Sequence, residues 1–289
     1  MTNSTVSRYW HEARAPRYSL SFAFPLLVAY EVLAFTLSRS EVSGVRNGAD
    51  VLLKSLFLML GGRDGLAVFG ALLVGGAAAV IWKDYRSSGL IRRRYFAWMA
   101  VESIVYALTF GVVASTLTVL LLPGLSVVRN VSALGVGLLA EWSLPTQLMI
   151  SLGAGVYEEL LFRVILVSGL AWLATVGFGW GVTRAKLFAV CLGALIFSAF
   201  HYIGPYGEPL ELGSFTFRTV AGLLFSGLYV LRGFGITAWT HALYDVFLAV
   251  GSDGKSGKGG KEGAIYRPFE LGMSSSSAFT FPSFPPFPS

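Results

Sequence analysis

At the centre of the chain lies the stretch GVYEELLFR, residues 155–163, in which two adjacent carboxylates and a guanidinium interrupt the apolar run Leu144–Val176. A charged side chain at mid-bilayer costs on the order of 2.5 kcal/mol or more, so ionisable groups at this depth predict a functional site. On a helix Glu159 and Arg163 are four residues apart, with the acid on the N-terminal side, which is the favourable order for an ion pair. Glu158 points about 100° away around the helix. We therefore predict that Glu159 and Arg163 compensate each other and that Glu158 is free to react. The alternative is a salt bridge that joins transmembrane helices.

The composition is typical of a protein that crosses the membrane several times. Of the 289 residues, 54% are hydrophobic and 13% are charged, and the mean hydropathy is +0.65. These values exclude a soluble domain with a large core. The net charge of +6 is explained by the basic cytoplasmic loops of a membrane protein, so we predict no nucleic acid as a partner. The single cysteine excludes an intramolecular disulfide.

Seven apolar runs are long enough to cross a bilayer, which takes about 20 residues. They predict an all-α fold, a polytopic transmembrane bundle of seven helices, or eight if the short run Val51–Leu60 also spans; an interfacial or a re-entrant helix is the alternative for that run. Val131–Trp142 is interpreted as a short amphipathic piece at the membrane surface. We expect a polar N-terminus at 1–17, a transmembrane protein domain at 18–250 and a disordered tail at 251–289, whose composition cannot support a packed core. The seven runs are Tyr18–Leu37, Gly65–Trp82, Tyr95–Leu122, Leu144–Val176, Ala185–Ile203, Ser214–Leu231 and Gly235–Val250.

Basic residues between the second and third runs predict the orientation. Lys83, Arg86 and the arginines at 92–94 crowd this connection, which indicates that it is cytoplasmic. Two further charged residues, Glu102 and Arg218, lie near the ends of their runs, where we expect the side chains to reach the interface.

Two of the three histidines lie in membrane runs, each four residues from a second residue of interest. His201 follows Phe197, and His241 precedes Asp245, so each pair shares one face of a helix. A single buried histidine is usually a satisfied core residue or a hydrogen bond between helices. Two of them together with Asp245 and the free Glu158 are harder to explain as packing. They supply a general base, neutral imidazoles and a second carboxyl group, which is enough to activate a water and stabilise an oxyanion.

The three motifs, EExxxR, then FxxxH, then HxxxD, resemble in their order those of the CPBP intramembrane protease family. This family includes the type II CAAX prenyl endopeptidases and the bacteriocin-processing, Abi-like proteins of bacteria. The resemblance covers about residues 147–250, the motif core, whereas the first half of the chain matches only in being hydrophobic. It implies an intramembrane endopeptidase, an integral multi-pass protein of the bacterial cytoplasmic membrane. Its partners would be the lipid bilayer and a membrane-anchored or lipidated protein substrate, prenylated proteins included.

The resemblance also implies a role for each motif residue. Glu158 and His201 would hold and deprotonate the attacking water, while His241 and Asp245 would face the carbonyl oxygen as it becomes an oxyanion. The eukaryotic prenyl endopeptidases carry Asn at the position of Asp245, and an ionised Asp would repel the developing charge. The residues with supporting roles are Glu159, Arg163 and Phe197.

The same residue set allows two forms of water activation. In the favoured form Glu and His hold the water directly and no cofactor takes part. The alternative is a zinc ion in a His₂-carboxylate site with an open position. The chain has no HExxH motif. The zinc ligands would be Glu158, His201, His241 and Asp245.

A second function of a different class fits the same polar groups, because buried carboxylates and histidines also form the proton relays of transporters and channels. A proton-coupled transporter more often has internal repeats and broken helices in both halves. This chain has no such repeat, and its intramembrane polar groups concentrate in the second half. We therefore favour the endopeptidase.

Overall fold

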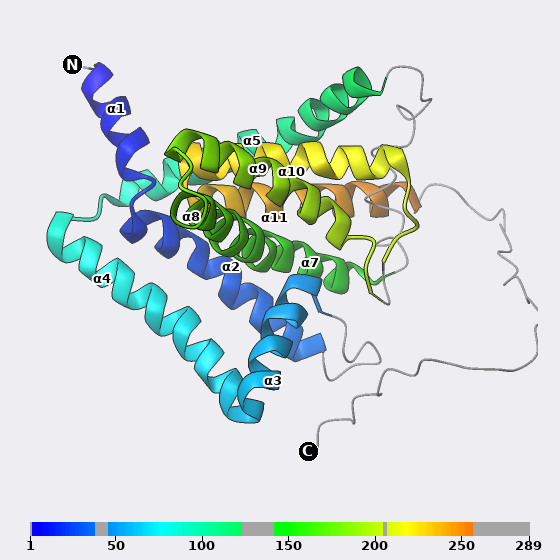
Figure 1. Cartoon of the computed structure of the whole chain (residues 1–289), viewed down its shortest axis with the longest axis horizontal. Coiled ribbons are helices and arrows are strands. Elements are labelled where there is room, and N and C mark those ends of the chain that lie inside the picture. The colour runs from blue at the N-terminus through cyan, green and yellow to red at the C-terminus, as the bar shows by residue number, and fades with distance from the viewer. Residues whose placement is uncertain (1, 38–45, 89, 123–141, 205–206, 257–289) are drawn as a thin grey trace, which may run out of the picture.

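The computed structural model describes residues 2–37, 46–88, 90–122, 142–204 and 207–256 (Figure 1). Every regular element among these residues is helical, which confirms the predicted all-α bundle. The helices, with η for a π-helix, are α1 (Thr2–Glu12), α2 (Pro16–Leu37), α3 (Gly48–Gly70), η1 (Ala71–Gly75), α4 (Gly76–Ser88), α5 (Arg93–Leu121), α7 (Leu144–Gly153), η4 (Ala154–Glu158), η5 (Leu160–Val167), α8 (Ser168–Val176), α9 (Val182–Phe200), α10 (Leu212–Arg232) and α11 (Phe234–Ser256).

The helices are long and apolar enough for a protein that crosses the membrane several times. Within the described part of the chain, six helical segments meet the length and hydropathy of a membrane span. The helix α11, which carries His241 and Asp245, covers the seventh apolar run but is not one of the six. The six segments are Pro16–Leu37, Gly48–Ser87, Arg93–Leu121, Leu144–Val176, Val182–Phe200 and Leu212–Arg232.

The segment Gly48–Ser87 is sharply bent after the short run Val51–Leu60, so this run forms a helix of its own direction. The backbone leaves the helical region at Gly61 and Gly62, and Gly62 has a φ of 57°, a conformation that favours glycine. The chain changes direction there, inside α3, so that residues 48–60 form one arm of a V and the rest of α3 with η1 and α4 forms the other (Figure 1). The short run is therefore a half-length helical arm that begins in the protein interior, beside α7 and α2.

The centre of the bundle is α11, which packs against α2, α5, α7, α10 and η4. A glycine makes the contact with η4 close. A Cβ added to Gly155 would overlap the backbone carbonyl of Ala238, so only glycine lets the two helices approach this far. This approach brings the carboxylate stretch against the helix that carries His241.

The predicted polar N-terminus contains the helix α1, which is tied to the bundle. Tyr9 is buried, and its hydroxyl donates a hydrogen bond to Glu102 at 2.6 Å. Arg232 at the end of α10 donates to the same carboxylate, with 2.8 Å between Nη2 and Oε2. The expectation that Glu102 reaches the interface is wrong, because this carboxylate joins three helices within the protein.

The boundary of the predicted tail also differs from the expectation. The helix α11 continues to Ser256, so residues 251–256 belong to the bundle's last helix. The rest of the predicted tail, 257–289, lies outside the described residues, as does the predicted surface piece Val131–Trp142 except for Trp142.

Candidate active site

The carboxylate stretch lies where the helix widens. Between α7 and α8 the chain forms two π-helices, η4 ending at Glu158 and η5 beginning at Leu160. In a π-helix the hydrogen bonds run from residue i to i+5, a rare arrangement that occurs frequently at functional sites. Glu158 and Glu159 point in different directions from this widened helix, and each has its own set of neighbours.

Glu159 and Arg163 form the ion pair expected from their spacing, and both are fully buried. Arg163 Nη1 lies 3.2 Å from Glu159 Oε1. None of the guanidinium nitrogens has a hydrogen-bond partner among the described residues, so the pair is an ion pair without a directed hydrogen bond. The guanidinium lies over the rings of Phe197 and Phe225, 4.4 and 5.4 Å from their centres. The charge of Arg163 is therefore held by one carboxylate and two aromatic faces.

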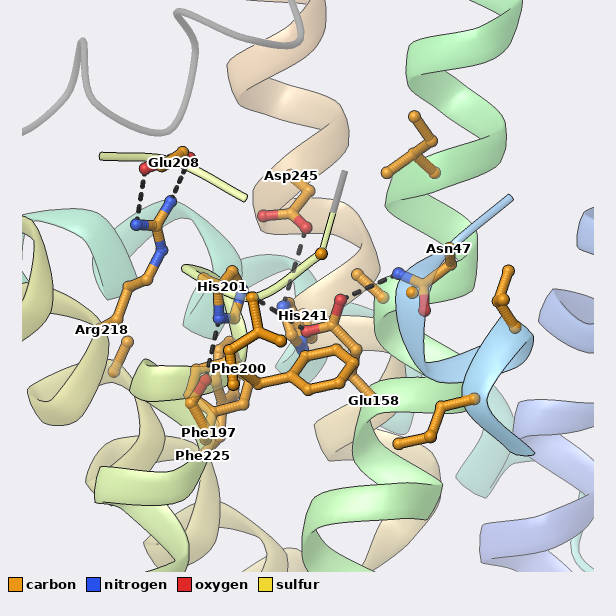
Figure 2. Close-up of a pocket in the computed structure, with 18 of the residues that line it drawn as sticks. Asn47, Glu158, Phe197, Phe200, His201, Glu208, Arg218, Phe225, His241 and Asp245 are labelled. Carbon is orange, nitrogen blue, oxygen red and sulfur yellow. Dashed lines mark hydrogen bonds and ion pairs between the residues drawn. The ribbon is translucent and has the colours of Figure 1, made fainter. Parts of the chain in front are cut away.

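Glu158 is held by a residue that the sequence analysis did not single out. Its Oε1 accepts a hydrogen bond of 2.8 Å from Nδ2 of Asn47, at the start of α3. Its Oε2 lies 4.0 Å from Nε2 of His201. Figure 2 shows the Glu158 carboxylate between Asn47 and His201. The two oxygens of Glu158 thus have different neighbours.

His201 is the first residue after α9, and the end of that helix fixes its tautomer. Its Nδ1 lies 2.9 Å from the backbone carbonyl oxygen of Phe197. A carbonyl oxygen only accepts, so Nδ1 carries the hydrogen and donates. In the neutral ring Nε2 is then an acceptor, and Nε2 is the atom that faces Glu158.

His241 connects the ion pair to the opposite side of the site. Its Nδ1 lies 2.7 Å from Glu159 Oε1, and its Nε2 lies 3.7 Å from Asp245 Oδ2, one helical turn further along α11. Phe225 stacks on the imidazole, with 4.3 Å between ring centres. Glu159 therefore contacts both Arg163 and the imidazole of His241.

These side chains surround a cavity of about 670 Å³ (Figure 2). All four residues predicted to be catalytic line it, together with Phe197. Glu159 and Arg163 are not among its lining residues and lie behind its wall. Apolar side chains make up most of the remaining wall, among them Val51, Leu52, Phe110, Ile150, Phe200, Ile203, Phe217, Phe225 and Leu248.

The positions of the four candidate zinc ligands can be compared with the geometry that zinc needs. A zinc ion needs three or four donors that converge at about 2.0–2.2 Å from one point. No group of three His, Cys, Asp or Glu side chains in the described part of the chain is placed to hold one ion. The four candidate ligands instead form two pairs, with separations of 4.0 Å for Glu158 and His201 and 3.7 Å for His241 and Asp245.

The sequence analysis missed two features of the cavity wall. Asn47 lies in the part of the chain without motifs, and its only local signal is that it precedes the short apolar run. Arg218 was expected to reach the interface, and this is wrong. It is buried and lines the cavity, where its guanidinium donates to both carboxylate oxygens of Glu208 at 2.7 and 2.5 Å. The two residues form a closed ion pair at the cavity wall (Figure 2).

Comparison with known proteins finds a match within residues 140–247 of the chain. Residues 140–247 match the family model described as type II CAAX prenyl endopeptidase Rce1-like. No curated protein and no solved structure matches the chain. The matched range contains Glu158, His201, His241 and Asp245, so the resemblance seen in the motifs is confirmed. At the level of the family, this part of the chain is similar to the domain of a membrane endopeptidase.

Proposed function

We propose that this chain, whose residues 140–247 form an Rce1-like domain, hydrolyses a peptide bond with a water held between Glu158 and His201. The observation that carries the proposal is the 4.0 Å gap between Glu158 Oε2 and His201 Nε2, both at the cavity surface. A general base acts within hydrogen-bond reach of its proton, directly or through one water. The gap leaves room for one water that hydrogen bonds to both atoms.

The tautomer of His201 supports this use of the gap. With Nδ1–H bonded to the Phe197 carbonyl, Nε2 accepts one hydrogen of the water, and the carboxylate of Glu158 accepts the other. Both hydrogens of the water are then engaged, and an oxygen lone pair faces the cavity. Attack of this oxygen on the scissile carbonyl carbon transfers one proton to the Glu158–His201 pair. The same proton passes to the leaving amide nitrogen when the C–N bond breaks, which yields a carboxylic acid and an amine.

The oxyanion formed by this attack needs a hydrogen-bond donor. His241 donates through Nδ1 to Glu159, so its Nε2 and the neighbouring Asp245 are the groups that face the cavity. His241 Nε2 and the Asp245 carboxyl group together carry one proton. Whether it lies on the imidazole or on the carboxylic acid, it supplies the hydrogen-bond donor for the oxyanion. A protonated Asp245 therefore does what Asn does in the eukaryotic prenyl endopeptidases. The negative Glu159 behind the ring stabilises a proton on the imidazole.

The walls of the cavity support a substrate that enters from the membrane. Most of the wall is apolar, and its polar groups include the two catalytic pairs, Asn47 and the Arg218–Glu208 ion pair. An extended peptide next to a membrane anchor or a lipid chain has the same mixed character. We propose membrane-anchored or lipidated proteins as substrates, prenylated ones among them, and the bacterial cytoplasmic membrane as the location.

The experiment that tests the function is a cleavage screen of the protein purified in detergent. Its substrates are peptides with a membrane anchor, with a prenyl group or with neither, and zinc content is measured on the same samples. We expect cleavage of a membrane-attached peptide and retained activity after treatment with a chelator. A chain that cleaves none of them but dissipates a proton gradient in proteoliposomes would instead be a transporter.

The Asp245→Asn variant separates the metal-free mechanism from one with zinc. An amide donates a hydrogen bond at any pH, so we expect this variant to remain active. In a zinc site the neutral amide would be a weaker ligand, and activity and metal content would fall together. Loss of both in this variant would make the protein a metalloprotease.

A further inference from the structure

We infer that Asn47 is a positioning residue for the hydrolysis, which fixes the Glu158 carboxylate so that one oxygen faces His201. This inference rests on the function proposed above and extends the site to a residue 111 positions before Glu158 and outside the matched range 140–247. Asn47 is 3% exposed and lines the cavity next to the carboxylate.

The two ends of the Asn47 side chain have different partners. Its Oδ1 accepts a hydrogen bond of 2.9 Å from the backbone nitrogen of Ala49, which makes Asn47 the N-cap of α3. The oxygen is thereby assigned, so the group that faces Glu158 is the NH₂, at 2.8 Å from Oε1. Rotating the amide by half a turn would lose both bonds and set an oxygen against a carboxylate. The cap therefore fixes the direction in which the side chain donates.

The backbone of Asn47 is held as firmly as its side chain. Its N–H donates to the hydroxyl of Tyr30 at 3.3 Å, and that hydroxyl donates to Asp50 at 2.7 Å. On the other side α7 is in contact, because a Cβ added to Gly153 would lie 2.6 Å from both Asn47 and the Tyr30 ring. Helices α2, α3 and α7 thus fix the donor before any substrate binds.

This arrangement orients the reacting carboxylate. With Oε1 bound to Asn47, the carboxylate cannot rotate without breaking a hydrogen bond to a charged acceptor, which is stronger than a neutral one. Oε2 is then held toward His201. Charged or titratable groups around Glu158 include Arg163 on its own helix, His201 directly after α9, and His241 and Asp245 on α11. Asn47 is the partner from the first half of the chain.

The test uses three substitutions that separate the cap from the donor. Asn47→Asp and Asn47→Ser both keep an N-cap acceptor, but neither presents an NH₂ to Glu158. Asn47→Ala removes the cap and the donor together. For the first two we expect a kcat lower by roughly 10- to 100-fold, the size of a lost charge-assisted hydrogen bond. The melting temperature should stay close to wild type in Asn47→Ser and fall in Asn47→Asp, which sets a second buried carboxylate against Glu158. KM should change by less than about twofold, because the substrate contacts are unchanged.

A merely structural role gives a different pattern, in which kcat follows the melting temperature and Asn47→Ser, which keeps the cap, has wild-type kcat. Wild-type kcat in both Asn47→Asp and Asn47→Ser would overturn the inference while leaving the proposed function intact. In a Glu158→Gln background, Asn47→Ser should cause no further loss, because it acts through that carboxylate. A full additional loss there would also overturn it. A wild-type chain without peptidase activity overturns both the function and the role of Asn47.

Discussion

Replacing Glu158 by Gln removes one acceptor and leaves the rest of the site in place. The Gln side chain has the same shape, and its carbonyl oxygen still accepts from Asn47 Nδ2, which lies 2.8 Å from Oε1 in the wild type. The NH₂ group then takes the position of Oε2, 4.0 Å from His201 Nε2, and it donates where the carboxylate accepted. The attacking water therefore loses the carboxylate that would take its proton and faces the NH₂ group of Gln instead.

The role of Glu158 as a general base sets the expected size of this effect. A positioned general base contributes roughly 10²- to 10⁴-fold, which corresponds to about 3–5 kcal/mol of barrier. We expect kcat to fall by that factor in a cleavage assay with a fluorogenic membrane-anchored peptide. The melting temperature in detergent should stay near that of the wild type, because the bond to Asn47 remains. Glu159→Gln is the matched control, since it changes the adjacent carboxylate and should lower stability by leaving Arg163 without its ion-pair partner. Wild-type turnover of Glu158→Gln would refute the assignment.

Three further predictions concern the surroundings of this carboxylate. Arg163→Ala leaves Glu159 buried without its cation, so we expect a loss of roughly 3–5 kcal/mol in the free energy of unfolding, seen as a lower melting temperature in detergent; unchanged melting would contradict the buried ion pair. His201 must accept through Nε2, and protonation removes that acceptor, so activity should fall at acidic pH; activity that stays flat with decreasing pH until the protein unfolds would exclude His201 as a base. Gly155→Leu forces η4 away from α11 and should lower both melting temperature and kcat, whereas Gly169→Leu, where a Cβ meets nothing within 4 Å, should change neither.

The sequence predicted the helices well, and it singled out four residues that line one cavity, because both leave a local signal. An apolar run of span length is visible in any window, and a charge within such a run stands out. The spacing of Glu159 and Arg163 also predicted their pairing, since residues four apart face each other on a helix. The catalytic roles of the four cavity residues remain predictions, to which the structure adds their convergence on one cavity.

The contacts between distant parts of the chain could not be predicted in this way. Asn47 bonds to Glu158 across 111 residues, and Glu102 bonds to Arg232 across 130. Such pairs depend on which helices pack together, and no pattern within one helix contains that information. The same reason explains Arg218, whose place near a run end is compatible with an interfacial side chain and with its actual partner Glu208.

The widening of the helix at η4 and η5 was also not predicted. It changes the path of the backbone at the Glu-Glu pair without an obvious change in composition. The residues of η4 and η5 are mostly apolar, and such a run is compatible with an α-helix and with a π-helix. Hydrophobic periodicity therefore does not distinguish the two forms here.

The ion pair within one helix has a consequence for how the protein enters the membrane during synthesis. Glu159 has two partners, Arg163 four residues away and His241, which is made 82 residues later. Placing a carboxylate without a partner at the bilayer centre costs a free energy of roughly 2.5–3.5 kcal/mol during insertion. Arg163 is available as soon as its own helix forms, long before α11 can dock. Arg163, which lies behind the finished site, therefore also compensates Glu159 during insertion. Its removal should reduce the yield of membrane-integrated protein, an effect that precedes folding.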